Sequence, residues 1–456
     1  MSNASAQVAV KTAGGITERN TICNSVMQGT VWGNIFCVAL LDKLGKYVYD
    51  NPKLLYYYKQ SVPIPPLEMV DDVLAIQKCG TKSIKINTAI NTFMEAEKLY
   101  LSEKKCNVIH VGSKWENCNE LKVHNKKMHE SKNEKYLGDS INSTGTQRGT
   151  IQERKQKGYG IVSQIVAIVT EAPLGCWRMK SGMLLRNSML VNSMLFNSEA
   201  WHGIVKDDVQ ILSRVDESLL RALFSAHSKT PKEALFLESG QLPIKYIWAS
   251  RRLNFLQTIL KRGENEITRK VYEAQKLNPK KGDFVLMVRE DKEMIQLDLS
   301  DHQIELMDKS TYQNLVKTKV KNSSFVFLQG LQVQHSKIKD IKYHTFKMQD
   351  YMYDPIMSAE DIRFLFALRT RTVRGIRKDF EGMFQNILCP LCKLHDDTIP
   401  NLEICEELRA VPRNGANYGD IFSPSVDIQR TAAVQFRALL QARDRILDWE
   451  EEEKVK

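Results

Sequence analysis

The order of apolar and polar positions divides the chain into a first part of mixed periodicity and a long helical part. Apolar residues recur at helical spacing over residues 32–44 and again over 86–101, which predicts two helices that each bury one face. The proline-rich stretch 62–66 between them predicts extended chain. The segment 104–112 ends in glycine and is expected to form a strand. We therefore predict an α+β unit over residues 21–148.

The pattern beyond residue 148 is almost wholly helical. Four segments repeat apolar residues every three or four positions and are separated by glycine or proline. They span residues 150–170, 179–199, 205–224 and 244–260. We expect them to form a helical region over residues 149–277, followed by a linker with some helix over 278–358, where charge runs alternate with short apolar pieces.

The last hundred residues predict two more helices. An arginine-rich helix is expected over residues 359–378, with Phe364, Leu365 and Leu368 on its buried side. Its arginines are Arg363, Arg369, Arg371, Arg374 and Arg377. An amphipathic helix is expected to end the chain before an acidic tail. The corresponding segments are 359–410 and 411–456, and residues 1–20 carry no periodic pattern and predict a flexible start.

Two adjacent acids interrupt an apolar run at residues 67–76. A strand with one or two buried faces does not normally carry a carboxylate pair without a cation or hydrogen bonds to offset desolvation. Neighbouring strand residues point to opposite faces, so a hairpin with Asp71 and Asp72 at its tip is the better way to bring both near one ion. Mg²⁺ commonly takes one or two carboxylates and substrate phosphates. A solvated turn is the alternative for the pair considered alone.

Three further motifs accompany the aspartates. Gln28-Gly29 precedes the first predicted helix, Lys104-Lys105-Cys106 follows the second, and Tyr136-Leu137-Gly138 comes after the predicted strand. In this order and at these separations, the four motifs resemble the palm of non-LTR (LINE-type) retrotransposon reverse transcriptases. The resemblance continues through residues 197–201, 238–244 and 251–253 and covers most of residues 20–410.

The resemblance implies a role for each motif in RNA-directed DNA synthesis. It implies Mg²⁺ ligands, a donor to the leaving pyrophosphate, a border of the nucleotide pocket and a seat for the primer end, in an enzyme that uses two metal ions. By this resemblance, Asp71 and Asp72 are the Mg²⁺ ligands and Lys105 is the donor to the pyrophosphate. Gln28 and Gly29 border the nucleotide pocket, and Tyr136, Leu137 and Gly138 seat the primer end. The helical region then resembles the thumb, which follows the duplex of RNA template and DNA primer.

One part of the family's catalytic set is missing. The family carries a third aspartate on a strand well upstream of the Gln-Gly motif, whereas residues 1–27 contain no aspartate. We therefore expect a truncated reverse transcriptase, with the second half of a palm, a thumb and a knuckle, weak Mg²⁺ binding and no independent polymerase activity. The alternatives are a non-catalytic nucleic-acid-binding protein that uses thumb and knuckle, and an expressed relic.

A group of cysteines forms the second candidate site. Cys389-Pro390-Leu391-Cys392 carries two thiols on one tight turn, typical of half a zinc site, and Cys405 is a third candidate ligand. LINE-type enzymes have a Cys-Cys-His-Cys knuckle after the thumb, and this segment resembles it. The expected histidine is replaced by Asn401, a poor zinc ligand, which leaves His395 as the candidate for the fourth place. Three reduced thiols without Zn²⁺ are the alternative.

Composition favours polyanionic partners. The formal net charge is +11 and the isoelectric point is near 9.0, and cationic side chains gain from releasing the counterions of phosphates. Candidate phosphate contacts in the thumb are Arg148, Arg154, Lys155, Lys157, Lys229, Arg251 and Arg252. No run of some 18 apolar residues predicts a membrane span, and nine mostly scattered cysteines suit a reducing compartment. We expect RNA and DNA partners in the cytoplasm and nucleus.

Overall fold

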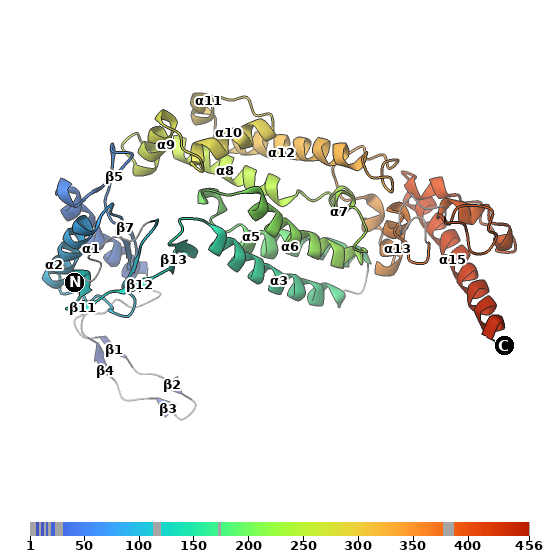
Figure 1. Cartoon of the computed structure of the whole chain (residues 1–456), viewed down its shortest axis with the longest axis horizontal. Coiled ribbons are helices and arrows are strands. Elements are labelled where there is room, and N and C mark those ends of the chain that lie inside the picture. The colour runs from blue at the N-terminus through green and yellow to red at the C-terminus, as the bar shows by residue number, and fades with distance from the viewer. Residues whose placement is uncertain are drawn as a thin grey trace. The chain divides into compact units, whose positions relative to one another are not determined.

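The chain forms two compact units. A computed structural model describes residues 6–8, 11–12, 15–16, 20–22, 31–112, 120–171, 175–376 and 387–455. Unit 1 comprises residues 1–145 and 263–278, and unit 2 comprises residues 146–262 and 279–456. Helix α9 (Ile267–Leu277) thus belongs to unit 1, although the chain on both sides of it belongs to unit 2 (Figure 1).

Unit 1 combines helices with short paired strands. Its helices are α1 (Val31–Tyr49), α2 (Gly80–Ala96), α9 and the short 3₁₀ helix η1 (Pro52–Leu54). The antiparallel pairs are β1 (Ala6–Val8) with β4 (Asn20–Ile22), β2 (Lys11–Thr12) with β3 (Gly15–Ile16), β5 (Tyr56–Tyr58) with β6 (Val62–Ile64), β7 (Leu67–Met69) with β8 (Asp72–Leu74), β10 (Lys122–Val123) with β11 (Lys126–Lys127) and β13 (Asn133–Tyr136) with β14 (Asp139–Asn142). Strand β9 (Asn107–Ile109) pairs in parallel with β12 (His129–Ser131).

The core of unit 1 lies between its first two helices. Leu44 and Val48 of α1 are fully buried and pack with Ile86 and Met94 of α2. These positions recur at the spacing that the sequence pattern indicated, so both helix predictions are confirmed. A smaller cluster joins the β5–β6 hairpin to α9 through Val62, Ile64 and Ala274, which explains why α9 belongs to unit 1.

Unit 2 is helical, and its described residues contain one isolated β-bridge, between Leu388 and Asp396. Its α-helices are α3 (Arg148–Thr170), α4 (Gly175–Leu185), α5 (Asn192–Met194), α6 (Lys206–Phe224), α7 (Lys232–Ser239), α8 (Ile244–Leu260), α10 (Phe284–Met294), α11 (Asp301–Leu306), α12 (Lys309–Gln332), α13 (Ala359–Arg369) and α15 (Val426–Val455). A π-helix, η3 (Arg186–Val191), continues α4, and 3₁₀ helices follow at η4 (Ser198–Ala200), η5 (Asp350–Tyr353), η6 (Pro400–Glu403), η7 (Glu406–Leu408) and η8 (Tyr418–Phe422).

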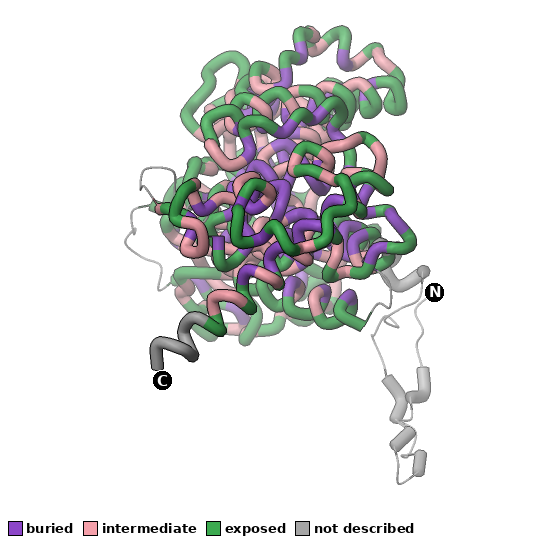
Figure 2. The backbone as a smooth tube through the Cα atoms, turned by 90° about the vertical axis from the view of Figure 1, so that its right-hand side faces the viewer, coloured by how far each residue is buried: buried purple, intermediate pink, exposed green. Residues whose placement is uncertain are grey.

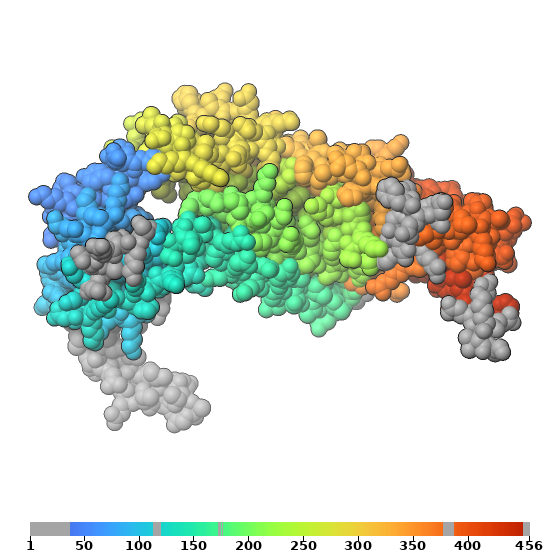
Figure 3. Space-filling view, viewed as in Figure 1, coloured from blue at the N-terminus to red at the C-terminus, as the bar shows by residue number. Residues whose placement is uncertain are grey.

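One large apolar core runs through unit 2. It includes residues from α3, α6, α7, α8, α13 and α15, and Trp201 and Trp248 meet edge to face within it, with ring centroids 5.1 Å apart. Figure 2 marks the buried positions in purple, and Figure 3 shows one face of the molecule with its atoms drawn in full. Among the described residues, no helix is both long and apolar enough to cross a membrane.

The structure adds detail to one prediction for this part of the chain and corrects another. The helices expected within residues 278–358 are α10, α11 and α12. Asp308 caps α12 by accepting from the backbone N–H groups of Ser310 and Thr311. The arginine-rich helix ends at Arg369 rather than at residue 378, since Arg371 has a positive φ of 50° that a helix cannot include. The four thumb segments are helical as predicted, although the second begins at Gly175.

The carboxylate of Glu238 forms the centre of a buried polar network in unit 2. It accepts hydrogen bonds from Tyr343 Oη at 2.7 Å, Tyr351 Oη at 3.1 Å and Arg369 Nε at 2.9 Å. Arg369 also donates to the carbonyl of Ile421 at 2.7 Å. Burial, followed by the Glu238 charge, raises the pKa of both tyrosines well above the usual range, so both hydroxyls stay protonated and donate. This network joins α7, the 343–351 segment, α13 and η8.

A second buried pair holds the π-helix in place. Arg186 and Asp216 are both fully buried, and the guanidinium donates twice to the carboxylate at 2.6 Å. Arg186 also donates to Gln241 Oε1 at 3.1 Å and to the carbonyl of Leu242 at 2.9 Å. Every strong donor of the buried cation is therefore directed at an acceptor, which a buried ion pair needs in order to offset its desolvation.

Replacing Glu238 with glutamine should destabilise unit 2 strongly. The variant leaves the charge of Arg369 buried without a counter-charge. Removing one partner of a buried ion pair lowers the free energy of unfolding by about 3–5 kcal/mol. Urea unfolding monitored by circular dichroism measures the change. Glu290→Gln, at an exposed position on α10, is the matched control and should change stability by less than about 0.5 kcal/mol. Equal stability of the two variants would contradict the role assigned to Glu238.

Candidate functional site

The Asp71–Asp72 pair lies at the end of a hairpin in unit 1. Leu67 pairs with Leu74 and Met69 with Asp72, so Val70 and Asp71 form a two-residue turn and Asp72 begins β8. Both aspartates are exposed. Val70 has a φ of 59°, a left-handed conformation that is strained for a β-branched residue. The predicted hairpin is thus present, and its identity as a polymerase palm stays a prediction.

The Tyr136-Leu137-Gly138 segment forms a tight turn that contacts this hairpin. Tyr136 pairs with Asp139, and Leu137 and Gly138 have φ values of 50° and 85°, the left-handed pair typical of a type I′ turn. The Tyr136 hydroxyl donates to the carbonyl of Leu67 at 3.2 Å, across 69 positions of sequence. Burial and then the charges of Asp72 and Glu68 raise the pKa of Tyr136. Two of the four sequence motifs therefore lie side by side.

Glu68 is the residue at this site that the sequence analysis missed. It is half-buried on β7, and burial, together with the charge of Asp42 on α1, raises its pKa to about 7. Within the described part of the chain, its Oε1 atom is buried and has no hydrogen-bond partner. The same atom lies 3.4 Å from the position that a Cβ at Gly45 would occupy, so the lack of a side chain there lets α1 approach the carboxylate. In the sequence, Glu68 could have been found as an acid between two apolar residues of a predicted strand, Leu67 and Met69.

The other residues of the polymerase motifs are Lys105, Gln28 and Gly29. Lys105 lies in a turn in which its backbone N–H donates to the carbonyl of Ser102 at 3.0 Å, and its side chain is exposed. Gln28 and Gly29 lie outside the described residues. Among the described residues, the carboxylates here do not form a group of three with ligand atoms within 4.8 Å of one another. The role of Asp71 and Asp72 as metal ligands therefore stays a prediction.

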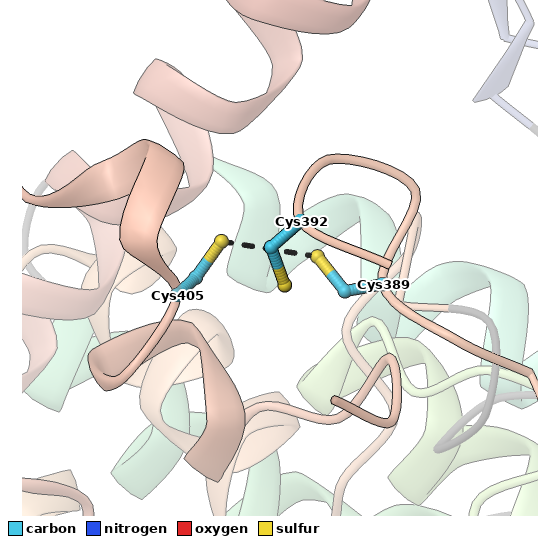
Figure 4. Close-up of side chains that lie close together, drawn as sticks. All are labelled: Cys389, Cys392 and Cys405. Atoms are coloured by element: carbon cyan, nitrogen blue, oxygen red, sulfur yellow. Dashed lines mark hydrogen bonds between the residues drawn. The ribbon is translucent and has the colours of Figure 1, made fainter. Parts of the chain in front are cut away.

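The three predicted cysteines meet in unit 2. The sulfur atoms of Cys389, Cys392 and Cys405 all lie within 4.8 Å of one another, and Sγ of Cys389 is 3.9 Å from Sγ of Cys405 (Figure 4). Cys389 and Cys392 lie on one loop, and Cys405 comes from the turn before η7. The three cysteines can hold a metal ion, because thiolates at this separation suit a soft or borderline cation.

The surroundings of the cysteines close the loop and shift the pKa values of two of the thiols in opposite directions. The Cys389 N–H donates to the carbonyl of His395 at 2.7 Å, and the Lys393 N–H donates to the carbonyl of Cys389 at 3.0 Å, which closes the loop. Burial raises the pKa of the Cys392 thiol, but the backbone N–H groups of Leu394 and His395 outweigh it, so the pKa is lowered. Burial, followed by the Cys389 charge, raises the pKa of the Cys405 thiol to about 12. A cation is therefore needed to hold all three as thiolates.

The histidine proposed as fourth ligand is not part of this cluster. The metal-binding group found among the described residues contains the three cysteines and does not include His395. Asn401, at the position of the family's histidine, donates through its side-chain amide to the carbonyl of Asp396 at 3.0 Å and so supports the loop. The structure thus offers three protein ligands and leaves the fourth position to water or to another group.

Several basic residues expected at phosphates have internal partners instead. Arg252 makes two hydrogen bonds to the Asp291 carboxylate at 2.6 and 2.8 Å. Arg251 donates to the carbonyl of Leu195 and to Asn192 Oδ1. These two guanidinium groups hold helices together and are occupied. Of the other expected contacts, Arg148, Lys157 and Lys229 are exposed, and Arg154 and Lys155 are half-buried.

No family model matches the chain, and comparisons with curated proteins and with solved structures found no match. The likeness to reverse transcriptases therefore depends on the sequence motifs and on the contact between two of them.

The stability of unit 1 should depend on the ionisation of Glu68. Its pKa is raised from 4.5 to about 7 in the folded state, so the folded state binds the proton more tightly than the unfolded state does. This contribution to the free energy of unfolding is therefore fully present below pH 4.5 and is lost as pH rises to about 7. Glu68→Gln should raise the thermal midpoint at pH 8 by up to a few degrees and leave it nearly unchanged at pH 4.

The matched control for Glu68 is Glu95→Gln, at an exposed position on α2. Differential scanning calorimetry at pH 4, 6 and 8 measures the midpoints. A pH profile of Glu68→Gln that runs parallel to that of the wild type would contradict the assignment.

Proposed function

We propose that this chain is an RNA-directed DNA polymerase of the non-LTR retrotransposon type, with little or no activity by itself. The observation that supports the proposal is the hydrogen bond from Tyr136 to Leu67, because it brings the Tyr-Leu-Gly turn against the Asp-Asp hairpin. In such an enzyme the primer end and the metal site must be adjacent. A solvated Asp-Asp turn would have no need of this neighbour.

The hairpin residues suit the role that the proposal gives them. Asp71 and Asp72 are exposed carboxylates on one tight turn and would hold Mg²⁺, which would stabilise the charge on the transferred and leaving phosphates. Tyr136 holds the position of β7 through its hydroxyl. With two carboxylates, the affinity for Mg²⁺ should be low and should depend on bound nucleotide, which accounts for the weak activity proposed.

A non-catalytic nucleic-acid-binding protein is the second candidate. It is favoured by the lack of a third carboxylate close to Asp71 and Asp72 among the described residues, together with the net charge of +11. Exposed cations of α3, such as Arg148 and Lys157, would then contact phosphates without any transfer chemistry.

We also infer that the metal of the cysteine cluster is Zn²⁺. Structural zinc sites use thiolates, and the Cys-x-x-Cys loop with a third, distant cysteine fits this chemistry. Two of the three sulfur atoms are buried, so the ion would be screened from solvent. The site would then tie the loop of Cys389 and Cys392 to the segment that carries Cys405.

Primer extension on an RNA template with Mg²⁺ separates the two candidate functions. Any incorporation by the wild-type chain should be abolished by Asp71→Asn, because the variant removes a metal ligand. Asp50→Asn, at an exposed position just after α1, is the control and should behave as the wild type does. Incorporation that survives in Asp71→Asn would exclude this hairpin as the catalytic centre.

Binding of an RNA–DNA hybrid tests the second candidate in the same preparations. Fluorescence anisotropy should show an affinity that falls by at least about tenfold when salt is raised about fourfold, and Asp71→Asn should not weaken it. Hybrid binding without incorporation would favour the binding protein. A chain that does neither would contradict both candidates.

Metal analysis tests the zinc proposal. Protein purified with Zn²⁺ and then dialysed should retain about one zinc ion per chain, measured by inductively coupled plasma mass spectrometry. Cys389→Ser and Cys405→Ser should each lose most of it, whereas Cys79→Ser, at an exposed position in unit 1, should retain it. Equal zinc content in all four proteins, or none in the wild type, would contradict the site.

A further inference from the structure

Two large aromatic side chains of unit 2 are exposed on either side of one lysine. Trp177 of α4 is 58 % exposed and Tyr353 at the end of η5 is 43 % exposed. Lys180 Nζ lies 5.9 Å from the centroid of the Trp177 ring and 5.0 Å from that of the Tyr353 ring, within range of a cation–π contact with each. Rings of this size are usually buried to a large extent, so an exposed pair indicates a binding surface.

The segments that carry the two rings are fixed by close packing. A Cβ added at Gly175 would lie 2.6 Å from the backbone nitrogen of Ala359, so the start of α4 packs directly on the start of α13. Tyr351 and Met352, immediately before Tyr353, are fully buried in the core. The backbone positions that carry the two rings are therefore held by the core, so a ligand that stacks on the rings meets a surface whose support is already in place.

Helices α4 and α13 also carry arginines. Arg178, next to Trp177 on α4, donates to the carbonyl of Thr170 at 2.5 Å. Arg363 on α13 donates to the carbonyl of Leu223 at 3.2 Å. Lys180 is therefore the cation that the structure places against both rings.

The acidic residues of the same segments are largely neutralised by partners elsewhere. Asp354 pairs with Arg430 at 3.0 Å, and Asp361 pairs with Arg437 at 2.7 Å. Glu360 offsets part of the Arg363 charge. The charge of Lys180 beside the rings is thus not offset by Asp354 or Asp361.

We propose that Trp177 and Tyr353 form a stacking site for a base of single-stranded nucleic acid, with Lys180 contacting an adjacent phosphate. Single-strand binding proteins combine aromatic rings, on which bases stack, with cations that follow the backbone, and this surface contains both. The proposal rests on the nucleic-acid binding proposed above and adds a strand type and a location. It does not depend on chemistry at Asp71 and Asp72.

A protein partner is the competing occupant, since tryptophan, tyrosine and arginine are also frequent at protein interfaces. Exposed Ile356 and Leu184 are available for such contacts. Charge decides between the two occupants. A lysine beside two rings complements a polyanion, and the chain as a whole is basic.

Binding of a labelled single-stranded oligothymidine to the full chain, measured by anisotropy over a series of salt concentrations, tests the proposal. Trp177→Ala should lower the affinity by about five- to a hundredfold, the measured range for one stacked base, without changing the slope of log K against log salt concentration. Trp177→Phe should retain most of the affinity because the ring remains. Lys180→Gln should reduce the slope by about 0.7, the value for one phosphate contact on a single strand.

The matched control is Trp449→Ala, because Trp449 is 59 % exposed on α15 and should not affect binding. Circular dichroism checks that each variant folds. The proposal is overturned when the wild type does not bind the single strand, when Trp177→Ala and Trp449→Ala behave alike, or when Trp177→Phe is as weak as Trp177→Ala.

The same preparations separate this proposal from the proposed function. Binding of the RNA–DNA hybrid with no effect of Trp177→Ala on the single strand overturns the stacking site and leaves the proposed function in place. Loss of single-strand binding in Trp177→Ala, together with no binding of the hybrid and no incorporation, supports the stacking site and contradicts the proposed function.

Discussion

The hydrogen-bonded carboxylate of Glu238 is the interaction on which the arrangement of unit 2 depends. Its partners Tyr343, Tyr351 and Arg369 come from segments more than a hundred positions along the chain. A charge without water around it is strongly destabilising unless every partner is in place, so these segments must assemble together. The stacking site includes Tyr353, two positions from Tyr351, and through its bond to Ile421 Arg369 also fixes the region in which the cysteines lie.

The sequence allowed the helices to be predicted wherever their buried face is regular. It indicated no helix bounds within residues 278–358, because α12 carries its buried residues Tyr312, Val316 and Val320 between lysines and polar residues. Its apolar stripe is therefore narrow. The segment 238–244 forms part of the resemblance, but the sequence does not show that Glu238 is buried. A buried glutamate cannot be told from an exposed one until its distant donors are known.

At the candidate site, too, local features could be predicted from the sequence and tertiary contacts could not. The Asp71 turn and the Leu137–Gly138 turn follow from local chemistry, whereas their contact through Tyr136 is a tertiary fact that no local pattern contains. Cys405 was predicted as a partner of the Cys389 loop, and the cluster contains it. His395 was chosen by elimination, and the cluster does not include it. Glu68 was overlooked because the adjacent aspartates offered a simpler source of charge.

Net charge proved a poor guide to where a polyanion would bind. Arg186, Arg252, Arg369 and Arg443 are all largely buried and pair with carboxylates inside unit 2, so much of its arginine stabilises the fold and contributes little to an external field. What distinguishes a binding surface is therefore cationic groups that lack an internal acid and lie beside exposed rings. By that criterion, the surface of Trp177 and Tyr353 is a better candidate than the arginines of α8, although sequence composition gives the two equal weight.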